Sequence, residues 1–133
     1  MADETSAVNE PLDDLFVDET ATPDKGLLRD ILKKYVQLTA SGEIHFLPSY
    51  DTLKNAQQKI LIILLSKKAI SLKTGSPEKI APKEIQTISG LPKGTVNPTL
   101  TALEEKKAAR SENGFYFVPN YAVTRIKGLF KDD

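Results

Sequence analysis

Apolar residues recur at helical spacing through most of the chain, with short alternating stretches between the helical ones. An apolar stripe predicts a helix over residues 25–38, with Asp24 as its N-cap. The stripe consists of Leu27, Leu28, Ile31, Leu32, Tyr35 and Leu38. Residues 43–47 alternate as a short strand would, and Pro48 ends the alternation. We therefore expect a helix and a short strand over residues 25–50.

The next apolar stretch predicts a long helix over residues 53–71. Residues 60–65 are apolar without a break, and helical geometry directs Ile62 and Ile63 away from the face that the others share. A helix that is apolar on more than one face lies either at the centre of a domain or in a subunit interface. The pattern leaves both alternatives open.

Residues 79–118 predict five short elements in a fixed order. A very short strand at Ile80 is followed by a helix from Pro82 to Ser89, where Pro suits the first turn. After the turn at residues 90–92, a second helix is expected over residues 93–107. A β-hairpin follows, because Asn113-Gly114 tolerates the positive φ angles of a two-residue turn.

Two details of this region affect the surface that it presents. Pro98 lacks an N–H group, so either the second helix bends there or regular helix begins there with Asn97 as its cap. In the second hairpin strand, alternation predicts Phe115 and Phe117 in the core and Tyr116 exposed. Residues 121–130 predict a closing helix with an apolar face.

Residues 89–106 read Ser-Gly-Leu-Pro-Lys-Gly-Thr-Val-Asn-Pro-Thr-Leu-Thr-Ala-Leu-Glu-Glu-Lys. They resemble the helix-turn-helix of the winged-helix superfamily, in the branch of the MarR-type regulators and small archaeal relatives. That branch has a Gly-Leu turn, a Lys-Gly-Thr-Val start and a Leu-x-x-Leu-Glu run, followed by a hairpin called the wing. The resemblance covers residues 80–118 well, the long helix before them moderately, and residues 1–50 hardly at all.

The resemblance implies an α+β fold, mostly helical, in which a winged helix-turn-helix carries extra N- and C-terminal helices. Composition, the apolar pattern and the resemblance together divide the chain into a disordered acidic arm (1–24), a helix and strand (25–50) and a winged-helix domain with a C-terminal helix (51–133). The resemblance also implies double-stranded DNA binding, by a transcriptional regulator or a chromosome-associated protein. A homodimer is expected because the helices over residues 25–38 and 121–130 are richly apolar and flank the domain.

The candidate DNA contacts lie on the second helix and the hairpin. Outside its apolar stripe, that helix carries short polar side chains and one lysine, which can reach phosphates and base edges in a major groove. These residues are Lys93, Thr95, Asn97, Thr99 and Thr101. Toward the hairpin, the residues expected to address the phosphate backbone are Lys106, Arg110 and Asn113.

Two departures from the family pattern affect this interpretation. Asn97 is the only side chain on the helix suited to bidentate base contacts, so phosphate-dominated binding and operator recognition both stay open. Lys107 stands where relatives often place the Gly that ends the helix. A winged helix that binds protein and not DNA is the alternative function, since a fold does not fix a function.

The charges are segregated along the chain. Residues 1–24 hold eight acidic residues and no Lys or Arg, whereas residues 25–133 hold all 18 basic residues and ten acidic ones, a net charge of +8. This asymmetry favours a polyanionic partner for the folded part. In the acidic arm, residues 12 and 15–17 form a small apolar patch, either a motif that docks on a protein partner or a transient helix with no role.

Other chemistry finds little support in the sequence. The chain has no cysteine, and His45 is its single histidine, so no thiolate zinc site or histidine-dependent triad can form within one chain. We therefore predict that the protein is not an enzyme and needs no cofactor or metal. Without a secretory signal or an apolar run long enough to span a membrane, it is expected in the cytoplasm, on the nucleoid if the cell is prokaryotic.

Overall fold

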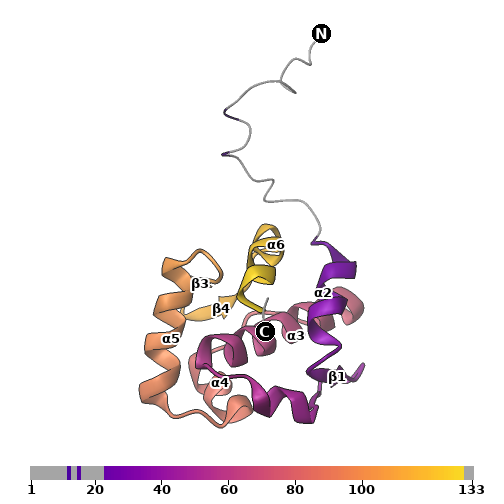
Figure 1. Ribbon diagram of the computed structural model, residues 1–133, viewed down its shortest axis with the longest axis horizontal. Coiled ribbons are helices and arrows are strands. Elements are labelled where there is room, and N and C mark those ends of the chain that lie inside the picture. The colour runs from indigo at the N-terminus through magenta and orange to yellow at the C-terminus, as the bar shows by residue number, and fades with distance from the viewer. Residues whose placement is uncertain (1–11, 13–14, 16–22, 131–133) are drawn as a thin grey trace.

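The computed structural model describes Leu12, Leu15 and residues 23–130, and the fold is α+β and mostly helical (Figure 1). The rest of the predicted acidic arm lies outside the described residues. A long central helix, α3 (Ala56–Thr74), is surrounded by the other elements. The described helices around it are α2 (Lys25–Leu32), α4 (Pro82–Ser89), α5 (Lys93–Glu105) and α6 (Val123–Ile126).

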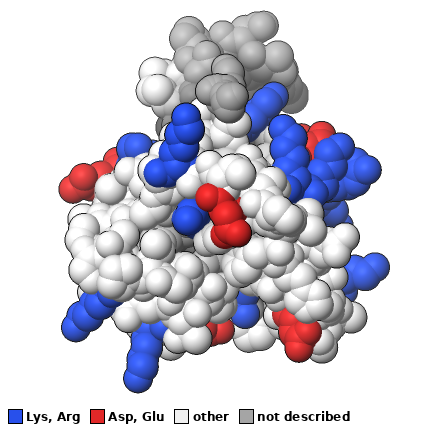
Figure 2. All heavy atoms as spheres, turned by 60° about the horizontal axis from the view of Figure 1, so that its bottom comes forward, with Lys and Arg blue, Asp and Glu red and all other residues white. Residues whose placement is uncertain are grey.

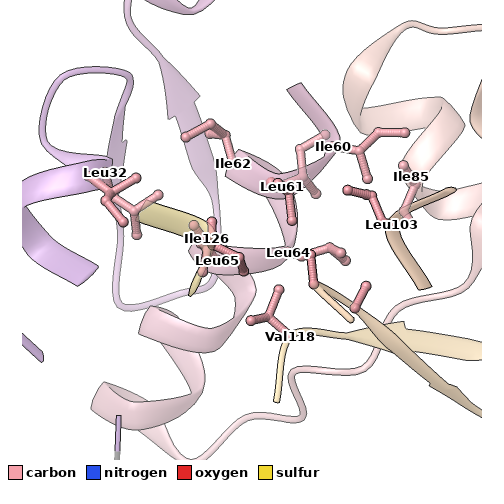
Figure 3. Close-up of a cluster of buried hydrophobic side chains, with 14 of the residues drawn as sticks. Leu32, Ile60, Leu61, Ile62, Leu64, Leu65, Ile85, Leu103, Val118 and Ile126 are labelled. Atoms are coloured by element: carbon pink, nitrogen blue, oxygen red, sulfur yellow. The ribbon is translucent and has the colours of Figure 1, made fainter. Parts of the chain in front are cut away.

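The helix α3 is central because its whole middle section is buried. Residues 60–65 are at most 1% exposed, and they include Ile62 and Ile63, which were expected on a second apolar face. Of the two alternatives for such a helix, the structure shows the central position, because α2 and the strand β1 (Val36–Leu38) also pack on α3. Figure 3 shows the side chains that gather around α3 from the later elements, among them Ile85, Leu103, Val118 and Ile126.

The first predicted helix is shorter than expected. The helix α2 ends at Leu32, and residues 36–38 form β1, which pairs antiparallel with β2 (Ile44–Phe46). Along β1 the side chains alternate from buried Val36 to exposed Gln37. The prediction of helix to Leu38 was wrong. Residues 36–38 begin with the β-branched Val36 and alternate between buried and exposed positions, as a strand does. The turn at Gly42, where φ is +98°, lets residues 44–46 pair with them as β2.

The helices α4 and α5 follow the sequence closely. Pro82 opens α4, and Gly90 ends it with a φ of +76°. The helix α5 starts at Lys93 and continues through Pro98, so the alternative in which Asn97 caps a shorter helix is excluded. The predicted stripe of α5 is buried, with exposures of 0–1% at Val96, Leu100 and Leu103. The 3₁₀ turn η3 (Pro48–Thr52) precedes α3, whose N-terminus is capped by the Asn55 side chain.

The hairpin consists of β3 (Arg110–Glu112) and β4 (Phe115–Phe117), and its Asn113-Gly114 turn has φ angles of +54° and +84°. The closing helix is broken into three pieces, with the 3₁₀ turns η4 (Asn120–Ala122) and η5 (Lys127–Phe130) on either side of the four-residue α6. Val123 and Ile126 are buried, whereas Leu129 and Phe130 are only partly covered.

The terminal helical segments pack on each other and on α3. Leu28, Ile31 and Leu32 of α2, and Val123 and Ile126 of α6, belong to the core of a single chain. Much of the apolar surface that motivated the homodimer prediction is therefore used inside one molecule. In the described part of the chain, every helix is too short or too polar to act as a membrane-spanning segment.

Candidate nucleic-acid interface

The outer side of α5 carries a strip of exposed residues along nearly its whole length. This strip consists of Lys93, Gly94, Asn97, Pro98, Thr101 and Glu105. It contains no carboxylate between Lys93 and Thr101, and Glu105 follows at the C-terminal end. The part of the helix that enters a groove first in a helix-turn-helix, its N-terminal half, is thus polar and uncharged apart from Lys93.

Two of the predicted groove contacts lie apart from this strip. Thr95 and Thr99 are half-buried on one flank of α5, and the Thr99 hydroxyl donates to the Thr95 carbonyl oxygen at 2.6 Å. The exposed Thr101 hydroxyl makes a longer bond of the same kind, 3.2 Å, to the Asn97 carbonyl oxygen. Lys93, Asn97 and Thr101 therefore share one face, whereas Thr95 and Thr99 only border it.

The start of α5 leaves backbone donors available. Pro92 is the N-cap residue and makes no side-chain cap bond, and its carbonyl accepts from the N–H groups of Thr95 and Val96. The N–H groups of Lys93 and Gly94 precede the first of these helical bonds, as at every helix start. Together with the exposed ammonium of Lys93, they form a positive end on the strip.

The hairpin is fixed to the segment just before α4 by a backbone bridge. The Ile80 N–H donates to the Tyr116 carbonyl at 3.0 Å, and the Tyr116 N–H donates to the Ile80 carbonyl at 2.8 Å. This pairing covers Tyr116, and burial, with Glu104 nearby, raises the pKa of its phenol. The predicted alternation was out of phase, because Phe115 is 45% exposed and Tyr116 packs against the core.

The outer face of the hairpin pairs cations with an aromatic ring and a carboxylate. Lys79 and Arg110 lie over the Phe117 ring, 5.3 and 5.9 Å from its centre. Both also interact with Glu112, where Lys79 donates a hydrogen bond and Arg110 lies 3.7 Å away. This bond and the charges of Lys79 and Arg110 lower the pKa of the Glu112 carboxyl. One carboxylate thus faces two cations and is bonded mainly to Lys79, so this cluster keeps a net positive charge.

The remaining predicted contacts lie at the two ends of the hairpin region. Lys106 is exposed at the end of α5, and its ammonium donates to the Gln57 side-chain oxygen at 2.6 Å. Asn113 is exposed at the hairpin tip. Among the described residues, Lys93 alone of the three predicted basic contacts has no side-chain partner. Lys93 is the first residue of α5, whereas Asn113 lies in the hairpin turn that follows the end of this helix.

Sequence reasoning missed some residues of this surface. Gly94 and Pro98 belong to the exposed strip, and a helical wheel with its stripe at Val96, Leu100 and Leu103 places both opposite that stripe. Lys79 joins the hairpin only through the bridge at Ile80, a pairing that no local pattern reveals. Figure 2 turns the lower side of Figure 1 toward the viewer; basic and acidic side chains are both spread over this mostly uncharged face, and an acidic one lies near its centre.

The described residues contain no group of three or more His, Asp or Glu side chains placed to hold a metal ion. His45 is exposed on β2, with its Nε2 3.1 Å from the Glu43 carboxylate. Comparison with known proteins gives no match, whether to a protein-family model, to a curated protein or to a solved structure.

Proposed function

We propose that this protein is a winged helix-turn-helix protein that binds double-stranded DNA, as a transcriptional regulator or a chromosome-associated protein. The observation that carries the proposal is the exposed strip of α5 (Lys93, Gly94, Asn97, Pro98, Thr101 and Glu105), which is free of carboxylates over its N-terminal part. A helix of this kind beside a β-hairpin fits the major groove, with the hairpin on the adjacent backbone.

The residues of the proposed interface would contact different parts of the DNA. Lys93 and the backbone donors at the helix start contact a phosphate. Asn97 offers the one amide suited to adenine, and Thr101 offers a hydroxyl of a size that reaches a base edge or a phosphate. Lys106 and Arg110 contact the phosphate backbone at the hairpin side, once the hydrogen bond of Lys106 to Gln57 and the ion pair of Arg110 with Glu112 are exchanged for phosphate contacts.

Asn97 is the one side chain of the strip suited to bidentate base contacts, which favours phosphate-dominated, weakly specific binding. The interface is also weak in positive charge, and this favours a second candidate, a winged helix that binds protein and not DNA. Lys106 and Arg110 are already engaged by neighbouring side chains, so their positive charge is partly used within the chain. Dimer formation and a place in the cytoplasm, on the nucleoid in a prokaryote, belong to the proposal, since a dimer would present two helices to a two-fold site.

A titration of the full chain with duplex DNA of random sequence, at 50 and 200 mM salt, separates the two candidates. Three basic contacts per protomer predict that log K falls with log salt at a slope of about −3 per protomer. A protein-binding module would give no salt-dependent shift.

Two exposed positions provide a matched pair of variants. Thr101→Glu places a carboxylate on the strip and should remove most of the binding by repulsion of phosphates. Gln37→Glu, at an exposed position of β1 on the side of the molecule opposite α5 in Figure 1, adds the same charge away from the strip and should leave binding nearly unchanged. Equal losses for both variants would show that α5 does not face the DNA.

A further inference from the structure

An apolar groove lies between α2 and the C-terminal part of α3, on the side of the molecule away from α5 (Figure 1). Its volume is about 420 Å³. The apolar residues that line it are Leu28, Leu32, Val36, Leu38, Ala69 and Leu72. Leu72 is 39% exposed, so one wall of the groove is an uncovered leucine. A groove of this size accommodates a few apolar side chains of a peptide.

Basic side chains surround this groove. They are Lys25, Arg29, Lys33 and Lys73. Asp30 is the acidic residue next to them, 3.4 Å from Arg29 and 3.8 Å from Lys33, and these exposed pairs are weak. Among the described residues, Lys25 and Lys73 have no acidic partner. An apolar groove with a basic rim selects an apolar segment that is flanked by acidic residues.

The chain itself contains such a segment. Leu12, Leu15 and Phe16 stand at positions i, i+3 and i+4, and would share one face if the segment became helical on docking. The acidic residues among and after them are Asp13, Asp14, Asp18 and Glu19. Leu12 and Leu15 are 57% and 76% exposed. With Leu72, they make up three of the four large apolar side chains that are exposed in the described part of the chain.

We propose that residues 12–19 of the acidic arm dock in the groove between α2 and α3 of the same molecule. The apolar face of the segment would cover Leu72 and its neighbours, and its carboxylates would meet the basic rim. This inference is independent of DNA binding, because α2 and α5 lie on opposite sides of the molecule in Figure 1.

The length of the connecting chain permits docking within one molecule. Pro23 is buried and Asp24 caps α2 by accepting from the Leu27 N–H, so the chain is fixed from Pro23 onward. Residues 20–22 can span up to about 10 Å when extended, and the groove begins at Lys25, close to the point where the chain is fixed. A linker this short gives the segment a local concentration near the millimolar range, well above that of any second copy.

Disulfide trapping tests the proposal, because the natural chain has no cysteine to interfere. Asp14→Cys and Asp18→Cys are each combined with Lys73→Cys at the rim of the groove and oxidised gently at low protein concentration. We expect a disulfide within one chain in at least one pair, which non-reducing electrophoresis shows as a faster-migrating monomer.

The controls keep the distances and change only the contact. Adding Leu15→Ser and Phe16→Ser to the same cysteine pair should slow the trapping about tenfold, since docking no longer raises the local concentration. Adding Val8→Ser, an apolar change outside the segment, should not slow it. Trapping with Thr101→Cys on α5 should stay slow.

Three results would overturn the proposal. Trapping that is insensitive to Leu15→Ser and Phe16→Ser in both pairs would show random collision. A cross-linked dimer in place of the monomer would show that the arm docks on a second copy. Faster trapping at Thr101→Cys would place the arm over the proposed DNA surface.

Discussion

Lys68 and Glu78 form an ion pair that lies largely beneath the surface. The Lys68 ammonium is 2.8 Å from the Glu78 carboxylate, and the Lys68 side chain is 2% exposed. It also donates to the Asn120 side-chain oxygen at 2.5 Å. Lys68 belongs to α3, Glu78 to the loop before α4, and Asn120 to the segment after the hairpin. One buried cation thus joins the central helix to both ends of the region that carries the proposed interface.

We predict that Lys68→Ala destabilises the fold by about 3 kcal/mol, because removal of one member of a buried pair leaves the other without compensation. The double variant Lys68→Met with Glu78→Gln should recover much of that loss, since no unpaired charge stays buried. Urea unfolding measures both changes. Lys67→Ala is the control, because its pair with Glu84 is longer, 3.7 Å, and more exposed, and should cost less than about 1 kcal/mol. Equal losses for the two lysines would contradict the prediction.

The part of the fold that sequence reasoning captured has strong local signals. Pro82 and Gly90 set the ends of α4, and Asn113-Gly114 sets the hairpin turn, because each needs a backbone geometry that few residues accept. The element at residues 36–38 was missed, since its apolar residues fit a helical spacing as well as a strand. Only the partner strand at residues 44–46 decides between the two.

In the candidate site, too, local patterns predicted one feature correctly and another wrongly. The buried stripe of α5 was predicted correctly, because three apolar residues at helical spacing fix the orientation of a helix. The phase of the hairpin strand was predicted wrongly, because alternation gives two faces but not which one is buried. That choice depends on the bridge between Ile80 and Tyr116, which joins positions far apart in the sequence.

A second prediction concerns the pH dependence of stability and rests on Tyr50. Its side chain is 5% exposed, and its hydroxyl has no hydrogen-bond partner among the described residues. Burial, with a smaller contribution from Asp51, raises the pKa of Tyr50 to about 12. An unfolded tyrosine ionises near pH 10. Between pH 10 and 12 the unfolded chain has therefore lost a proton that the folded chain retains, and stability falls as the pH rises.

Tyr50→Phe should remove this alkaline loss, which amounts to at most about 3 kcal/mol for a shift of two pKa units. At pH 7 the same variant should change stability by less than about 1 kcal/mol, because the hydroxyl makes no bond that would be lost. Urea unfolding at pH 7 and at pH 11.5 measures the two differences. A large loss at pH 7 would indicate a bonded hydroxyl.

A third prediction follows from the position of Pro98 inside α5. Proline has no N–H to donate to the Gly94 carbonyl, and its ring crowds that carbonyl. Since Pro98 is exposed, Pro98→Ala restores a helical bond and removes no core contact. We expect a gain of about 2 kcal/mol in the free energy of unfolding. Pro82→Ala is the matched control, because a proline in the first turn costs a helix little, and its effect should be small.

The fourth prediction tests the proposed phosphate contact at the start of α5. Lys93→Ala should weaken DNA binding and reduce the salt slope by about one unit, because one fewer phosphate is neutralised. The fold should not change, since Lys93 is exposed and has no side-chain partner among the described residues. Lys34→Ala, at an exposed lysine in the turn after α2, is the control and should keep the full slope. If the two variants lose equal amounts of slope, binding depends on net charge alone and α5 holds no defined phosphate contact.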